Sequence, residues 1–154
     1  MGIVLFLLSA WFAEAHSKIF DDCSKFIGTC DYYLCKESNS ACGAEGYYLE
    51  FGYRYCQKFE TRKSEYSAGG QTWLSEVKAC LQQEIENSRA GSCREARSVA
   101  LSSHVTCYER TNYCELSFWD KYRVYSTVNE ELEYRDFAKI AFRIAGSCFT
   151  FEEE

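Results

Sequence analysis

Ten cysteines are the residues of this chain whose type and spacing most clearly indicate chemistry. They are Cys23, Cys30, Cys35, Cys42, Cys56, Cys80, Cys93, Cys107, Cys114 and Cys148. Their number is even, no pair has the C-x-x-C spacing of a zinc site, and only His16 and His104 could add imidazole ligands. The pattern therefore favours five disulfides over a metal site, and we expect neither a metal nor another cofactor.

A histidine beside two serines is the second group that could react. Ser102, Ser103 and His104 are consecutive in a segment with helical periodicity, and immediate neighbours in a helix do not face one another. A nucleophilic pair is therefore disfavoured, and we interpret His104 as a surface or interface residue of a helix. The sequence words that surround the catalytic histidines of small secreted ribonucleases and phospholipases are absent, so we do not predict an enzyme.

An acidic group at Glu130, Glu131 and Glu133 could be read as a set of calcium ligands. It lacks the alternating oxygen ligands and the turn glycine of an EF-hand loop. We interpret it as the solvated first turn of a helix, favoured by the helix dipole and capped by Thr127 together with Glu130.

The first residues indicate export. Ile3 to Phe12 read IVLFLLSAWF, followed by Ala13-Glu14-Ala15, which carries small residues where a signal peptidase cleaves. We predict a secretory signal peptide over residues 1–15 and a single domain over 16–154, with His16 in a disordered mature N-terminus. No membrane span is expected after signal removal, and the product is secreted into the extracellular space, where disulfides persist.

Composition limits the classes of partner. The chain has 154 residues, of which 47% are hydrophobic, so it can bury a core. Its 17 Lys and Arg against 23 Asp and Glu give a net charge of -6, which excludes the basic footprint of a nucleic-acid-binding protein.

Helical periodicity runs through most of the remaining sequence. One apolar stripe falls between Tyr47 and Phe59 and includes Gly52, where we expect close approach of another backbone. Ser67 to Gly70 is interpreted as a break before a second stripe from Trp73 to Ile85. The segment from Tyr113 to Val128 mixes periods and is also predicted to be helical.

Two further helices follow the break at 87–91. Ser92 and Glu95 form a capping-box signature at the start of the first of them. Its buried line is predicted to be Cys93, Ala96, Ala100 and Cys107. The stripe of the last helix is Leu132, Phe137, Ile140, Ala141, Ile144, Ala145 and Cys148, opposite Arg135, Lys139 and Arg143.

Each of the four apolar stripes, at 47–59, 73–85, 93–107 and 132–148, carries one or two cysteines. A disulfide joins alpha carbons that are only about 4.4 to 6.8 Å apart, so a bridge between two helices must lie at their interface. The predicted fold class is therefore all-α, a compact helical bundle crosslinked by five intrachain disulfides.

The cysteine spacing and the words around it resemble the stanniocalcin family of secreted glycoprotein hormones. The resemblance rests on CDYYLCKES at Cys30 to Ser38, CQKF at Cys56 to Phe59, YSAGGQTWLSEVKACL at Tyr66 to Leu81, and CYERTNYC at Cys107 to Cys114. It implies the pairs Cys23–Cys35, Cys30–Cys56, Cys42–Cys93, Cys80–Cys107 and Cys114–Cys148.

Two departures mark the chain as a shortened, divergent member. Family members typically carry an eleventh cysteine that links two chains, and the sequence given has none, so a covalent dimer is not supported and a non-covalent dimer stays open. No asparagine is followed by x-Ser/Thr, so no N-glycan is predicted.

The aromatic content leaves two interpretations open. Twelve Tyr and eleven Phe exceed what one small core requires, so large rings either fill a thin helical interior or stand exposed as anchors for a partner. The candidates for exposure are Tyr32, Tyr33, Tyr47, Tyr53, Tyr122 and Tyr125.

The resemblance implies a secreted, hormone-like regulatory protein that binds an extracellular receptor or protease. In the family this role means calcium and phosphate homeostasis or inhibition of a pappalysin-type metalloproteinase. The alternative is a secreted disulfide-rich toxin or effector protein, although a pI near 5.1 argues against attack on membranes. Catalysis is the third hypothesis.

Overall fold

The computed structural model describes residues 22–133 and 135–148. Within these ranges the regular structure is helical and no strand occurs, which confirms the all-α prediction. The α-helices are α1 (Asp31–Ser40), α2 (Arg54–Arg62), α3 (Ala68–Ser88), α4 (Cys93–Arg110), α5 (Phe118–Val128) and α6 (Arg135–Ser147). The short helical turns are η1 (Cys23–Phe26), η2 (Tyr48–Tyr53), η3 (Lys63–Glu65), η4 (Tyr113–Glu115) and η5 (Asn129–Glu133).

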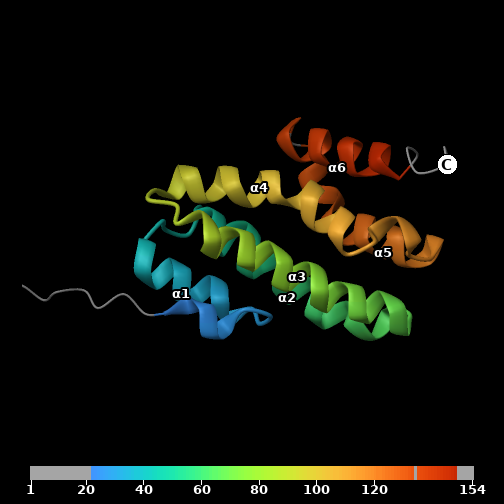
Figure 1. Ribbon diagram of the computed structural model, residues 1–154, viewed down its shortest axis with the longest axis horizontal. Coiled ribbons are helices and arrows are strands. Elements are labelled where there is room, and N and C mark those ends of the chain that lie inside the picture. Colours follow the sequence, from blue (N-terminus) through green and yellow to red (C-terminus); the bar gives the residue numbers. More distant parts are fainter. Residues whose placement is uncertain (1–21, 134, 149–154) are drawn as a thin grey trace, which may run out of the picture.

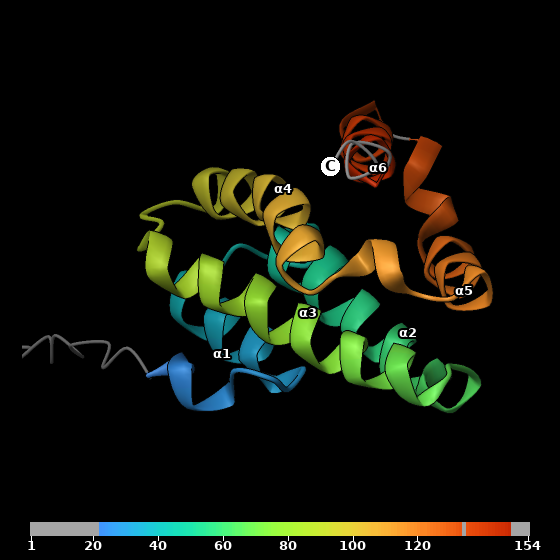
Figure 2. The ribbon, with the colours of Figure 1, turned by 45° about the vertical axis from the view of Figure 1, so that its right-hand side comes forward.

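The long helix α3 is the centre of the bundle. It packs antiparallel to α4, to which it is joined by the turn at 89–92, and α2 runs back along it from the η3 connection (Figure 1). Helix α1 and η1 cover one end of this layer. At the other end α5 leads through η5 to α6, which packs on α4 and is seen nearly end-on in Figure 2.

Serine side chains cap the N-termini of three of the α-helices. The hydroxyl of Ser92 accepts a hydrogen bond from the backbone N–H of Glu95 at 3.2 Å, which confirms the predicted cap of α4. Ser67 and Ser117 cap α3 and α5 in the same way. The segment predicted as a break at Ser67 to Gly70 is therefore the start of α3, because the serine cap outweighs the poor helix propensity of the two glycines.

The apolar core consists of two clusters. The first joins α1, η2 and the facing ends of α3 and α4. Its large members are Tyr32, Tyr33, Tyr47, Tyr48 and Ile85. The second lies between α3, α4 and α5, and its members are Tyr66, Trp73, Leu74, Val77, Cys107 and Val124. The predicted buried line of α4 is confirmed at Ala96, Ala100 and Cys107, whereas Cys93 is only half-buried.

Five disulfides tie these elements together. They are Cys23–Cys35, Cys30–Cys56, Cys42–Cys93, Cys80–Cys107 and Cys114–Cys148. These are the pairs that the family resemblance implies, and no cysteine among the described residues is free. Cys80–Cys107 joins α3 to α4 at their interface, and Cys114–Cys148 ties the end of α6 to η4.

Two local predictions are wrong. A Cβ at Gly52 would lie 2.4 Å from the ring of Tyr33, so this glycine admits a side chain from α1 rather than another backbone. Thr127 does not cap the last helix, because α5 continues through it and its hydroxyl donates to the carbonyl of Arg123 at 2.8 Å.

The aromatic side chains divide between the two interpretations left open by the sequence. Tyr32, Tyr33 and Tyr47 are buried and edge-packed on one another, so these three candidates for exposure belong to the interior. Tyr122 and Tyr125 are exposed, as predicted, and Tyr53 is half-buried. Large rings therefore both fill the interior and stand on the surface.

Over the described ranges, no helix combines the length and the apolar character needed to cross a bilayer. The predicted signal peptide at 1–15 and His16 lie outside the described residues.

Candidate functional site

The outer face of α5 carries the largest group of exposed aromatic side chains in the described part of the chain. Phe118, Trp119, Tyr122 and Tyr125 each have 53% to 73% of their surface exposed. Their spacing places them on adjacent turns of one helix, and Trp119 contacts both Phe118 and Tyr122 edge to face. We call these four residues the α5 aromatic face.

A buried carboxylate fixes α5 against α3. Asp120 is 1% exposed and accepts hydrogen bonds from the hydroxyls of Ser67 at 2.6 Å and Ser117 at 2.8 Å, and from the backbone N–H of Ser67. Burial alone would raise the pKa of Asp120, but these bonds and the charge of Arg123 outweigh it and hold the pKa below its ordinary value. The aromatic face therefore sits on a helix whose position is fixed by a charged group.

Helix α2 holds the other end of α5. The guanidinium of Arg62 donates to the hydroxyl of Thr127 at 2.7 Å and to that of Ser126 at 3.2 Å, and it also pairs with Glu65. With both ends held, the exposed rings of α5 are presented on a rigid support.

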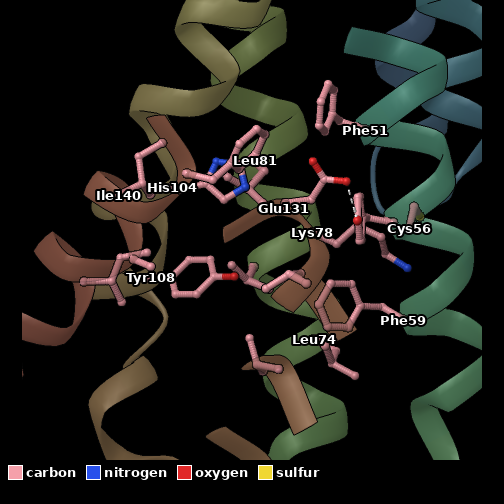
Figure 3. A pocket seen from close by; sticks show the side chains of 18 of the residues that line it. Phe51, Cys56, Phe59, Leu74, Lys78, Leu81, His104, Tyr108, Glu131 and Ile140 are labelled. Carbon is pink, nitrogen blue, oxygen red and sulfur yellow. Dashed lines mark hydrogen bonds between the residues drawn. The ribbon is translucent and has the colours of Figure 1, made fainter. Parts of the chain in front are cut away.

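A cavity of about 340 Å³ lies inside the bundle, between the two core clusters and beneath α6. Helices α2, α3, α4, α5 and α6 all contribute to its wall. Of the described residues that line it, ten are aromatic and three carry a formal charge, namely Glu60, Lys78 and Glu131. Figure 3 shows His104 and Tyr108 on one wall and Phe51 and Phe59 on the other, with Glu131 between them.

The volume of this cavity lies in the range of small-molecule binding sites. It equals the liquid volume of about eleven water molecules. Cavities of about 300 to 1,000 Å³ with mainly apolar and aromatic walls are typical of small-molecule sites.

Glu131 is the most buried charge on the cavity wall, with 6% of its surface exposed. Its Oε1 accepts a hydrogen bond from the hydroxyl of Tyr55 at 2.5 Å and lies 3.7 Å from a guanidinium nitrogen of Arg54. Burial and this bond raise the pKa of Tyr55, so the phenol keeps its proton and acts as the donor. Among the described residues no hydrogen bond reaches Oε2, which is left as an acceptor.

The opposite wall offers two further polar groups from α4. The Nδ1 of His104 lies 2.7 Å from the carbonyl oxygen of Ala100, which can only accept, so Nδ1 carries the proton and Nε2 is an acceptor. Burial lowers the pKa of His104, so the ring is neutral near pH 7. The hydroxyl of Tyr108 points toward the middle of the cavity in Figure 3 and has no hydrogen-bond partner among the described residues.

The one cation among the described lining residues is already neutralised. The ammonium of Lys78 pairs with the carboxylate of Glu60. The groups of Glu131 and His104 left to face a ligand are therefore hydrogen-bond acceptors, and the buried indole N–H of Trp73, which has no partner among the described residues, is a donor.

The structure separates the residues that sequence reasoning grouped. The hydroxyls of Ser102 and Ser103 donate to carbonyls of their own helix, at 3.0 and 2.9 Å, and neither bonds His104. The expectation of a solvated turn is wrong for Glu131, which is buried, whereas the side chain of Glu130 is 62% exposed and pairs with Arg54 and Lys58. The side chain of Glu133 lies outside the described residues.

The cavity itself was missed, because its wall combines residues from five helices that no short sequence window brings together. Over the ranges that the structure describes, no cluster of three or more His, Cys, Asp or Glu could hold a metal ion. Comparisons of the chain with protein-family models, with curated proteins and with solved structures find no match.

Proposed function

We propose that the chain is an exported regulatory protein that acts without catalysis, by binding another protein through the α5 aromatic face. The observation that carries this proposal is the set of four large rings, each more than half exposed, on one rigidly held helix. Large aromatic side chains are the typical anchors of protein interfaces, because they bury much area at small entropic cost.

The charge of α5 indicates the chemistry of the partner. Asp120 is the one acidic residue of the helix and it is buried, while Lys121 and Arg123 keep part of their surface exposed beside the rings. A complementary partner surface has an apolar groove bordered by carboxylates. Such a partner would bind faster at low ionic strength, because the borders of the two surfaces attract one another.

Export is supported by the disulfides. Five bridges in one domain are typical of proteins that fold in an oxidising compartment. The agreement of these five pairs with those implied by the stanniocalcin resemblance supports a hormone-like role, in calcium and phosphate homeostasis or as an inhibitor of a pappalysin-type metalloproteinase.

The inhibitor role can be tested by titrating a pappalysin-type metalloproteinase with the purified protein. We expect a stoichiometric loss of proteolysis with the unchanged chain. At least about tenfold more of the variant Trp119→Ser/Tyr122→Ser should be needed for the same inhibition, because hot-spot aromatic residues contribute about 2 kcal/mol or more each to binding. The control is Phe142→Ser, because Phe142 is an 81% exposed aromatic residue on α6.

Equal inhibition by the two variants would contradict a role for the α5 aromatic face. No inhibition by the unchanged chain would contradict the inhibitor role. The wider proposal is then decided by capture from a mixture of secreted proteins. A partner retained by the unchanged chain and by Phe142→Ser, but lost with Trp119→Ser/Tyr122→Ser, supports it. The absence of any saturable partner contradicts it.

A further inference from the structure

We propose that the cavity between α2, α3, α4, α5 and α6 binds a small apolar molecule whose polar end donates a hydrogen bond, such as an aliphatic alcohol or amine. This site is distinct from the α5 aromatic face, with which it shares only Tyr125 among its described lining residues. Ligand binding in the cavity can therefore be tested independently of protein binding by the α5 aromatic face.

The wall of the cavity selects an apolar body. Rings from every helix around it face the space, among them Phe51 and Phe59 from the side of α2 and Tyr108 from α4 (Figure 3). A chain or ring system that fills this space gains contacts with these rings on all sides, whereas water inside it finds few polar partners.

The polar groups on the wall select the head group. Oε2 of Glu131 and Nε2 of His104 are acceptors, and the hydroxyl of Tyr108 can accept as well as donate. A ligand that donates a hydrogen bond satisfies one of these groups in a place where water is scarce. An ester, which only accepts, can bond the indole N–H of Trp73 but leaves the acceptors of Glu131 and His104 unsatisfied.

The charge of Glu131 excludes anions. Lys78 pairs with Glu60 and the His104 ring is neutral, so no free cation among the described lining residues balances a carboxylate head placed beside Glu131. Two carboxylates in one weakly hydrated site repel each other. The site should therefore discriminate an alcohol or amine from the fatty acid of the same chain length.

The exposure of Tyr125 shows where a ligand enters. Tyr125 lines the cavity and is also 54% exposed, so the space reaches the surface beside α5.

The test uses four probes with the same eight-carbon chain, 1-octanol, octylamine, octanoate and methyl octanoate, measured by calorimetry on the disulfide-intact protein. We expect octanol, octylamine or both to bind at least about tenfold more tightly than octanoate and methyl octanoate. The two donor probes separate a neutral head group from a cationic one. The proposal is overturned if neither octanol nor octylamine binds more tightly than octanoate and methyl octanoate, or if none of the four produces heat.

Two matched variants connect the preference to the site. Glu131→Gln removes the buried charge and should reduce the preference for octanol over octanoate by about tenfold. Glu130→Gln is the control, because its side chain is 62% exposed and pairs with Arg54 and Lys58 outside the cavity. An unchanged preference in Glu131→Gln, or the same loss in both variants, overturns the assignment.

A third variant tests the location. Ala141→Trp places a large ring into the cavity from α6 and should abolish binding of the donor probes, whereas Phe142→Trp, at the exposed neighbouring position, should keep it. Both proteins are first compared by circular dichroism. If Ala141→Trp does not fold, the Glu131 and Glu130 variants decide the question alone.

Discussion

The hydroxyl oxygen of Ser67 lies 2.6 Å from Oδ2 of Asp120, so the residue that caps α3 donates a hydrogen bond to a buried carboxylate in the first turn of α5. The cap of α5 itself, Ser117, donates to the same oxygen at 2.8 Å. Each serine at the same time accepts a backbone N–H of its own helix. One carboxylate thus orients both caps, and the two helix starts are fixed relative to each other.

Replacing Asp120 by Asn should lower the free energy of unfolding by about 2 to 4 kcal/mol, because hydrogen bonds to a charged, buried acceptor contribute more than neutral ones. Chemical denaturation measures this directly. Asp136→Asn is the control, since Asp136 is exposed on α6 and its replacement should change stability by no more than about 0.5 kcal/mol. Equal effects of the two substitutions would show that the carboxylate of Asp120 does not hold the helix starts.

The contribution of Asp120 should disappear in acid. Because its pKa in the folded protein lies below the ordinary value of 3.8, the unfolded chain binds the proton first as the pH falls. The stability that Asp120 provides is complete above pH 3.8 and is lost as the pH falls through the lower folded value. The difference between the unchanged protein and Asp120→Asn should therefore shrink below about pH 4. A constant difference from pH 7 to pH 2 would contradict this.

The two glycines at the start of α3 should respond oppositely to alanine. A Cβ at Gly70 would lie 2.8 Å from the carboxylate carbon of Asp120, whereas one at Gly69 would meet only the hydroxyl of Ser67 at 3.9 Å. Gly69→Ala should be neutral or stabilise by up to about 1 kcal/mol through helix propensity. Gly70→Ala should destabilise by about 1 to 3 kcal/mol. Thermal unfolding of the two variants provides the comparison, and similar melting temperatures would contradict the close approach of Asp120.

Periodicity and caps predicted much of the fold. The stripe between Tyr47 and Phe59 and the cap at Ser92 depend on neighbours within a few residues, and both are present in the structure. The glycines after Ser67 disfavour a helix and so predict a break, and the carboxylate that supports the Ser67 cap is 53 residues away. Local signals could not include that contact.

The burial of single aromatic residues could not be predicted in the same way. Tyr33 and Tyr47 pack on each other across a loop, and the packing depends on Gly52 leaving space for the Tyr33 ring. The burial of Glu131 could not be predicted either, because Tyr55, which donates a hydrogen bond to its carboxylate, lies on another helix. Contacts between distant segments decided which of several similar side chains became core, site or surface.

The Cys114–Cys148 disulfide should hold α6 over the cavity. It closes a loop of 34 residues, and restricting such a loop in the unfolded chain contributes about 3 to 4 kcal/mol in the entropic model. In the variant Cys114→Ser/Cys148→Ser we expect faster hydrogen exchange of the backbone amides of α6, with α3 still protected. Equal acceleration in α3 and α6 would show that the bridge stabilises the whole bundle rather than the cover of the cavity.

His104 should make the protein less stable as the pH falls from 7 toward 5. Burial lowers its pKa below the ordinary value of 6.5, so between these two values the unfolded chain holds a proton that the folded protein does not. The stability contributed by neutral His104 is therefore complete above pH 6.5 and decreases as the pH falls toward the folded value. His104→Gln cannot be protonated, so its free energy of unfolding should fall less over this range, as measured by urea denaturation at each pH. Because any contribution of His16 is common to both proteins, parallel curves would mean that His104 is not shielded from water in the cavity wall.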